Sequence, residues 1–173
     1  RFLRMDGGRL TAHGTKEAPI VFASRTGNLR SWDGLQLLND GVADLRFVEI
    51  VEAFRGVDMG DGSLILEYSK LLRNDAGIFL NGTVDEFFVF LNEFSGNTTV
   101  AIGNQTRPRV TLDARLNFWG DPSGPTHPSN PGGSGDSFSG EVLFEPFLGG
   151  ADVDNAAAVN LTTFDVTQLS FDI

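Results

Sequence analysis

The feature that most constrains this chain is a repeat of about 22 residues. Four short segments of the form glycine, apolar, any residue, apolar recur at spacings of 22, 21 and 22 residues, with Thr replacing the glycine in the fourth. They are "GLQLLN" from 34, "GVDMGD" from 56, "GIFLNG" from 77 and "TVAIGN" from 99. Apolar positions that recur at the repeat spacing and alternate within each segment are typical of strands stacked repeat upon repeat.

Aligning the repeats predicts five columns of inward-facing side chains. The first strand supplies Leu35, Val57, Ile78, Val100 and then Leu37, Met59, Leu80, Ile102. A second strand supplies Leu45, Leu66, Phe88, Val110, then Phe47, Tyr68, Phe90, Leu112, then Val51, Leu72, Phe94, Leu116. The first repeat fits more loosely, with Leu10, Ala12, Ile20 and Phe22 expected 25 residues before their counterparts and the insert "SRTGNLRSW" absorbing the difference.

These columns predict an all-β chain folded as a parallel β-solenoid with coils of about 22 residues. Helix is disfavoured because the repeats are rich in Val, Ile and Phe, with Gly, Asn and Asp between the strands. A β-sandwich also gives short strands at regular spacing, but it does not require the same columns to align four times. We expect the solenoid to occupy residues 1–149, and residues 150–173 to form a linker and an extra C-terminal strand.

Three segments carry a family resemblance: "GRLTAHGTKEAPIVFAS" at 8–24, "SWDGLQL" at 31–37 and "NFWGDPSGPTHPSNPGGSGDSFSGEVLFEPFL" at 117–148. Through them, residues 1–149 resemble the right-handed parallel β-helix repeat proteins of the pectate-lyase-like superfamily. The resemblance implies a right-handed β-helix and a location outside the cell or at the surface of a prokaryotic cell. It implies little about activity, because one fold hosts many functions.

The Pro- and Gly-rich stretch within residues 117–140 is predicted to be an exit loop that closes the solenoid, because these residues do not continue a strand ladder. Phe118 and Trp119 are expected to pack over the last coil. The alternative is a ligand-binding loop in which Trp119 stacks on a bound molecule.

Composition excludes several classes of function. The net charge of −10 argues against nucleic acid and anionic membranes as partners. The chain has no cysteine, which excludes disulfides and zinc–thiolate sites. No apolar run approaches the ~20 residues of a membrane-spanning helix. The start at "RFLRMDGGRL" looks like the interior of a β-structure, and we therefore expect a processed or trimmed N-terminus.

The outward-facing positions predict no catalytic residue, no metal and no cofactor. β-Helix enzymes that act on polysaccharides use outward carboxylates from adjacent coils, whereas the column Gln36, Asp58, Phe79, Ala101 has a single one. On the second strand, opposite charges stand 21 residues apart: Arg46 with Glu67, Glu49 with Lys70, and Glu52 with Arg73. Such pairs predict ion pairing between coils. His13 and His127 are expected at the surface.

Four Asn-x-Thr sequons, at Asn81, Asn97, Asn104 and Asn160, are candidate N-glycosylation sites in a secreted protein. The alternative for Asn81 and Asn104 is a structural role in turns, and both roles can hold.

The two ends of the chain suggest self-association. Phe164 and Val166 alternate with polar residues, as do Leu169, Phe171 and Ile173, which predicts an amphipathic strand that folds back on its own coils or adds to a neighbouring copy. At the other end, Phe2 and Leu3 lie on an apolar strand with no capping helix. We expect a secreted, non-enzymatic subunit of an extracellular fibre or surface layer, joined head-to-tail to copies of itself. The alternative is a carbohydrate-binding or polysaccharide-cleaving β-helix protein, with Trp32, Phe79 or Trp119 stacked on sugar rings.

Overall fold

The computed structural model describes residues 1–152, and all regular secondary structure in this part of the chain is β. It contains no helix, and so none that is long and apolar enough to cross a membrane. The strands are β1 (Phe2–Asp6), β2 (Arg9–His13), β3 (Ile20–Phe22), β4 (Gly34–Leu38), β5 (Gly41–Arg46), β6 (Val48–Val51), β7 (Arg55–Glu67), β8 (Lys70–Leu72), β9 (Ala76–Phe90), β10 (Glu93–Ser95), β11 (Val100–Asn104), β12 (Leu112–Asp113), β13 (Phe138–Ser139) and β14 (Val142–Leu143).

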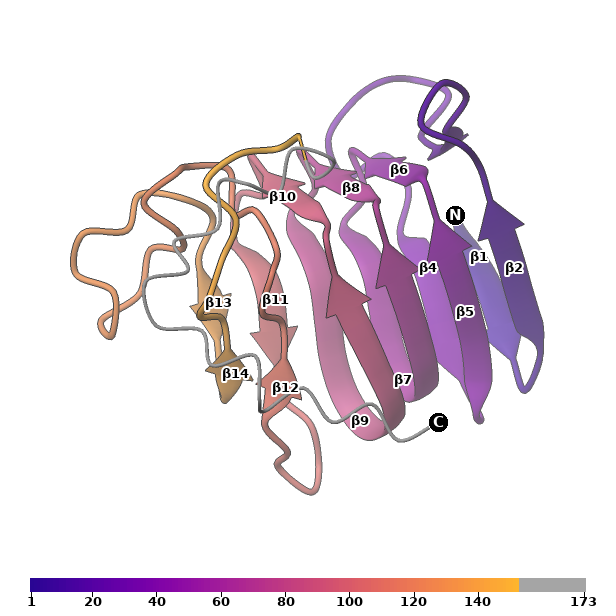
Figure 1. The fold of residues 1–173 in the computed structure, drawn as a ribbon. Coiled ribbons are helices and arrows are strands. Elements are labelled where there is room, and N and C mark those ends of the chain that lie inside the picture. Colours follow the sequence, from indigo (N-terminus) through magenta and orange to yellow (C-terminus); the bar gives the residue numbers. More distant parts are fainter. Residues whose placement is uncertain (153–173) are drawn as a thin grey trace.

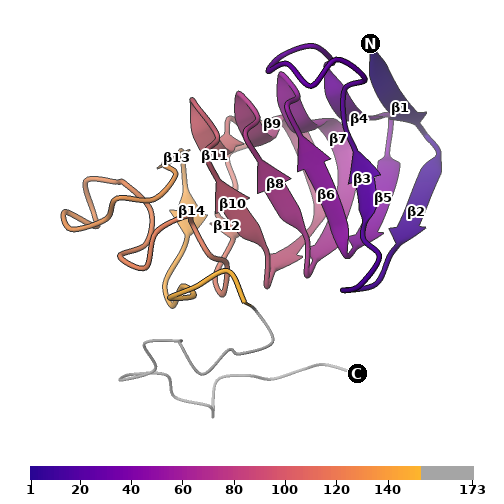
Figure 2. The same ribbon diagram turned by 90° about the horizontal axis from the view of Figure 1, so that it is seen from above.

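The strands form three sheets in which every pair of strands is parallel. The largest sheet has the order β1-β4-β7-β9-β11-β13, with β2 and β5 joining it alongside β7; the others are β10-β8-β6-β3 and β12-β14. Each set of strands pairs with the next set along the chain, and we call each set a rung: β1–β3, β4–β6, β7–β8, β9–β10, β11–β12 and β13–β14. Figures 1 and 2 show the rungs side by side, an arrangement consistent with a parallel β-solenoid.

The core lies between the sheets, and the predicted columns are confirmed through its middle rungs. Leu35 pairs with Val57, which pairs with Ile78, and all three are fully buried. The same holds for Leu37, Met59 and Leu80. These residues meet at spacings of 21 or 22 because one rung uses that length of chain.

Each of the five predicted columns is wrong at one or more positions in the fourth or fifth rung. Ile102, not Val100, pairs with Ile78, because Val100 pairs with Ala76. Leu66 pairs with Val89, because two register shifts within the β7–β9 pair displace the later residues of β9. Phe88 is therefore exposed, and Phe94 pairs with Leu71 instead of Leu72.

The first rung also differs from the prediction. β1 is the counterpart of β4, whereas Leu10 and Ala12 belong to β2 and pair with Ala43 and Leu45. The offset is 33 residues, not 25, because the long loop between β3 and β4 lies within this rung.

The corners of the rungs explain why Phe47 and Tyr68, predicted to face inward, lie outside the core, whereas Leu112 of the same predicted column is buried. Four residues at the corners after β5, β7, β9 and β12 have left-handed backbone: Phe47, Tyr68, Leu91 and Leu116, with φ of 49°, 49°, 57° and 58°. Residues with large side chains rarely adopt this conformation, so the sequence does not predict left-handed backbone at these four positions. The left-handed turn places Phe47 and Tyr68 outside the core, where their rings stack at 5.2 Å.

Buried polar side chains hold these corners in register. In one ladder, Asn92 accepts from the backbone nitrogen of Ser69, and Asn117 in turn accepts from that of Asn92, each at 2.9 Å. In a parallel ladder, Asn74 accepts from the backbone nitrogen of Ala53 at 2.9 Å. Buried polar groups need hydrogen-bond partners. These bonds supply partners to backbone groups at turns that lie outside the sheets.

Candidate functional site

The N-terminal edge is the first candidate surface. Among the described strands, β1, β2 and β3 each pair on one side only, with β4, β5 and β6 respectively. Apolar side chains are exposed along this rung: Phe2 by 50%, Leu3 by 43%, Ile20 by 36% and Val21 by 54%. An edge of this kind presents backbone donors and acceptors to another strand. We use "N-terminal edge" for the outer side of β1, β2 and β3.

The first 30 residues, which form the N-terminal edge and the loops beside it, carry a net positive charge. Residues 1–30 hold six Lys and Arg side chains and two carboxylates, a net side-chain charge of +4 in a chain whose net charge is −10. Two side chains of this segment contact the next rung: Arg9 lies 2.6 Å and His13 2.8 Å from Asp44. The hydrogen bond with His13, followed by that from Arg9, outweighs burial and lowers the pKa of Asp44.

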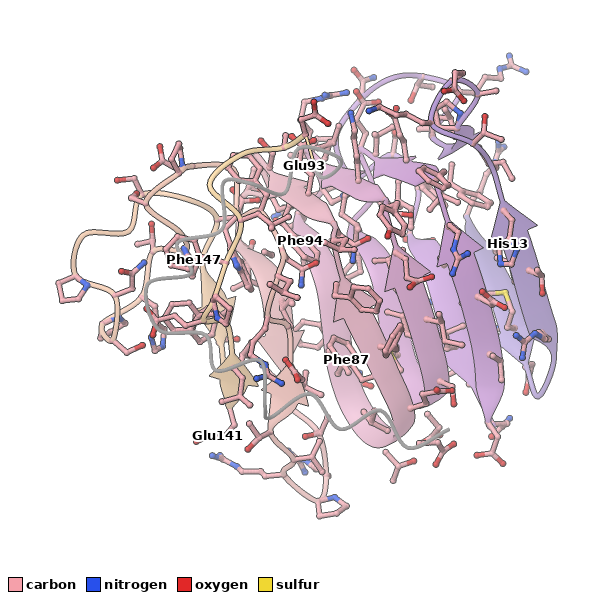
Figure 3. The ribbon with its side chains drawn as sticks, viewed as in Figure 1. His13, Phe87, Glu93, Phe94, Glu141 and Phe147 are labelled. Carbon is pink, nitrogen blue, oxygen red and sulfur yellow. The ribbon has the colours of Figure 1, made fainter. Side chains whose placement is uncertain are left out.

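The opposite end of the stack is closed by an aromatic plug, which we define as Phe94, Trp119, Phe138, Phe144 and Phe147. Consecutive rings in this order have centroids 5.3 to 6.3 Å apart. Trp119 is fully buried, and Phe138 and Phe144 are nearly so. The exit loop within residues 117–140 packs on the plug, with His127 stacked on Phe138 at 4.1 Å. Figure 3 shows Phe147 and Glu141 at this end and His13 at the other.

The closed end is acidic and has short edges. Residues 116–150 hold four carboxylates and no Lys or Arg. The last strands, β13 and β14, have two residues each. Asp136 in this segment accepts hydrogen bonds from the backbone nitrogens of Gly96 and Asn97 at 3.0 and 2.8 Å. Burial raises the pKa of Asp136 although these bonds oppose the shift.

An outer groove of about 370 Å³ lies over the first three rungs. Its aromatic wall is the stacked pair Phe47 and Tyr68, and its rim includes Lys16, Glu49 and Lys70. Lys70 lies 3.8 Å from both Glu49 and Glu93, on the rungs before and after its own. Burial of Glu93, labelled in Figure 3, raises the pKa of its carboxyl despite the nearby Lys70.

The predicted ion pairs between rungs are confirmed. Arg46 bonds Glu67, Lys70 pairs with Glu49 at 3.8 Å, and Arg73 pairs with Glu52 at 3.6 Å. The predicted pairs form because opposite charges one repeat apart in the sequence become neighbours on adjacent strands. Glu93 extends the second pair to a third rung.

The described residues contain no group of three or more His, Cys, Asp or Glu side chains that could hold a metal ion. His13 contacts Asp44, and the ring of His127 contacts Ser129 and Phe138. Neither histidine contacts the carboxylates around Lys70 in the part of the chain that the structure describes.

The expected sugar-stacking residues are not exposed platforms. Trp119 is fully buried, which overturns its role as a ligand-binding ring. Trp32 is half-buried and donates from its indole nitrogen to the carbonyl of Val51 at 2.8 Å. The guanidinium of Arg55 lies over the ring of Phe79, 3.8 Å from its centre.

The sequons differ in accessibility. Asn97 is 7% exposed, and its amide nitrogen donates to Leu71 at 2.9 Å and to Asp136 at 2.7 Å. Asn104 is 9% exposed, and its amide donates to two backbone carbonyls at 2.8 Å. A glycan on either residue would require these bonds to be lost, and N-glycosylation of both residues stays a prediction. Asn81 is exposed, and Asn160 lies outside the described residues.

The structure brings Phe2 and Leu3 of the predicted assembly set to the N-terminal edge, whereas Phe164, Val166, Leu169, Phe171 and Ile173 lie outside the described residues. Sequence reasoning missed Ile20 and Val21 as parts of this surface because it placed Ile20 in an inward column. It also missed the asparagine ladders, although Asn74 and Asn97 stand 23 residues apart and Asn92 and Asn117 stand 25 residues apart.

No family model, curated protein or solved structure matches the chain.

Proposed function

We propose that this chain is a right-handed parallel β-helix with a non-enzymatic structural role outside the cell or at its surface. In this proposal, copies stack head-to-tail into a fibre or surface layer. The N-terminal edge of one copy receives the C-terminal end of the next, so that the rungs of neighbouring copies form one continuous stack.

One observation carries the proposal: the two ends of the stack are unlike. The first rung combines open strand edges, exposed apolar side chains and a net positive charge. The other end has buried aromatic rings and four carboxylates in residues 116–150. A surface with one open basic end and one acidic end favours head-to-tail contacts, because like ends repel and unlike ends attract.

The proposed contact uses main-chain hydrogen bonds for affinity and the apolar residues of the edge for packing, as in strand addition to a sheet. Leu3 and Val21 are the informative positions because they lie on separate strands of the N-terminal edge and are 43% and 54% exposed. A carboxylate at either position adds charge to an apolar contact and faces an acidic partner.

The test compares the full chain with its Leu3→Glu/Val21→Glu variant by analytical ultracentrifugation and electron microscopy over a concentration series. We expect the wild type to assemble as concentration rises and the variant to stay monomeric. The matched control is Phe88→Glu, which changes an exposed apolar residue far from the edge strands and leaves assembly unchanged. Wild-type monomers at every concentration, or equal assembly of wild type and edge variant, would contradict the proposal.

A second candidate function, carbohydrate binding, is supported by the outer groove. The stacked pair Phe47 and Tyr68 supplies an apolar wall, and Lys70 and Glu49 supply polar groups on the rim. Aromatic faces of this kind pack against sugar rings. Affinity electrophoresis against a panel of neutral and acidic polysaccharides tests it: binding that is lost in Tyr68→Ala and kept in Tyr68→Phe supports the groove. If none of the panel retards the wild type, this candidate fails.

A further inference from the structure

The chain returns from the closed end of the stack toward the first rung. After β14, Phe144 packs in the aromatic plug and the backbone nitrogen of Leu148 donates to Asn117 at 3.0 Å. Four residues later, Asp152 lies 3.5 Å from Lys16, which is in the loop between β2 and β3. In Figure 1 the yellow segment runs from β14 toward β10 and β8. The described chain therefore ends in the outer groove, beside its own first rung.

We call the remaining residues, 153–173, the tail. Its charge and its pattern of apolar residues are complementary to those of the N-terminal edge. The tail holds three Asp and no Lys or Arg, whereas residues 1–30 have a net side-chain charge of +4. Its apolar residues alternate with polar ones at Phe164 and Val166 and again at Leu169, Phe171 and Ile173. An alternating, acidic segment matches an open, basic and partly apolar edge in both charge and pattern.

The tail is also long enough. Phe164 is the twelfth residue after Asp152. An extended chain spans ~3.3 Å per residue, which gives a reach of roughly 40 Å. Six rungs at the ~4.8 Å strand spacing of a sheet extend only about 29 Å. Apolar residues of the tail can therefore reach any rung of their own molecule, and the first rung is the nearest to Asp152.

We infer that residues 161–173 of the same chain dock on the N-terminal edge as an added strand and compete there with the next copy. The inference rests on the proposed assembly role of that edge. The same chain is the favoured source because a tethered segment has an effective concentration of order millimolar. Pairing of this edge with the N-terminal edge of a second copy is disfavoured, because both edges belong to positively charged segments that repel each other.

This contact would make assembly self-limiting. While the tail covers Phe2 and Leu3, the edge is capped and the chain stays monomeric at low concentration. When the tail leaves, by exchange or by proteolysis, the edge becomes available to the acidic end of another copy.

The experiment compares the full chain, a chain lacking residues 160–173, and a full-length control in which residues 160–173 are scrambled. Hydrogen–deuterium exchange of the β1 and β2 amides is measured at a concentration where all three are monomeric, and assembly is measured over a concentration series. We expect protection of these amides in the wild type alone, and assembly of the truncated and scrambled chains at concentrations at least tenfold lower. A peptide of residues 158–173, added to the truncated chain, should restore protection and suppress assembly.

The outcomes separate this inference from the proposed function. Assembly of the wild type with loss of assembly on truncation would make the tail a strand donated between copies, which overturns the inference and keeps the proposed function. Edge amides protected by the tail in a chain that never assembles would support the inference and overturn the proposed function. Equal exchange in wild type and truncated monomers would overturn the inference whatever the assembly state.

Discussion

The side-chain oxygen of Asn97 accepts two hydrogen bonds from Asn74, one from the backbone nitrogen and one from the side-chain amide, each at 3.1 Å. The two residues occupy equivalent corners of adjacent rungs. Each asparagine satisfies backbone groups of the rung before it. The ladder therefore fixes the register between rungs at the corners, where no strand pairing does so. The ladder ends at Asp136, which the amide nitrogen of Asn97 reaches at 2.7 Å.

Breaking this ladder should destabilise the fold. Asn74→Ala leaves the backbone nitrogen of Ala53 and the carbonyl of Ile50 without their bonds to Asn74, at a fully buried corner. Unpaired buried groups cost about 1–3 kcal/mol each, and we expect a loss of about 3 kcal/mol in the free energy of unfolding. Urea denaturation measures it. The control Asn81→Ala, at an exposed asparagine, should stay within about 0.5 kcal/mol of wild type.

The aromatic plug should be the most sensitive part of the closed end. Phe138→Ala removes a ring that contacts Trp119, Phe144 and His127, and buried Phe→Ala substitutions cost about 3–5 kcal/mol. Trp119→Phe should cost less, about 1–2 kcal/mol, because the buried indole N–H has no hydrogen-bond partner among the described residues and its removal offsets part of the lost packing. Thermal unfolding of both variants gives the comparison, and a larger loss for Trp119→Phe would contradict it.

The half-buried carboxyl of Glu93 should make stability depend on pH. Burial raises its pKa in the folded chain, so the fold binds this proton more tightly than the unfolded chain does. The resulting stabilisation is present below the pKa of an unfolded Glu and is lost as pH rises through the raised value. As the pH rises from the pKa of an unfolded Glu through the raised pKa of Glu93, the stability of the wild type should fall relative to that of Glu93→Gln.

Asp44, whose pKa is lowered, should give the opposite sign: its contribution to stability is lost as the pH falls. Unfolding midpoints at successive pH values, with Glu17→Gln as an exposed control, test both signs.

N-glycosylation, if the chain passes through a host that recognises Asn-x-Thr, should occupy Asn81 among the described sequons. Its side chain is exposed, whereas the amides of Asn97 and Asn104 are buried and bonded. Peptide mass spectrometry should locate the glycan mass on the Asn81 peptide and find it absent in Asn81→Gln. Full occupancy of Asn97 in folded protein would contradict the expectation.

The middle of the fold could be predicted from the sequence because its geometry is periodic. Leu35, Val57 and Ile78, and the ion pair between Lys70 and Glu49, follow from the spacing of one rung. The position of Phe88 could not, because the bulges within β7 and β9 add residues without a change in composition.

The corners and the first rung were less predictable for other reasons. Left-handed backbone at Tyr68 is dictated by neighbouring turns and by the buried Ser69 and Asn92, not by the preference of a tyrosine. Val21 was not expected at the candidate surface because its exposure depends on which strands lack a neighbour, and that depends on the pairing of the whole first rung.

The central claim, that copies stack through the N-terminal edge, is tested most directly by X-ray diffraction from oriented assemblies of the chain. Head-to-tail stacking continues the rungs along the fibre axis, so the ~4.8 Å strand spacing should appear on the meridian. It should be accompanied by a longer repeat of roughly 30 Å for the six rungs of each copy. Fibres that place the ~4.8 Å reflection on the equator, as lateral association of copies would, would contradict the claim.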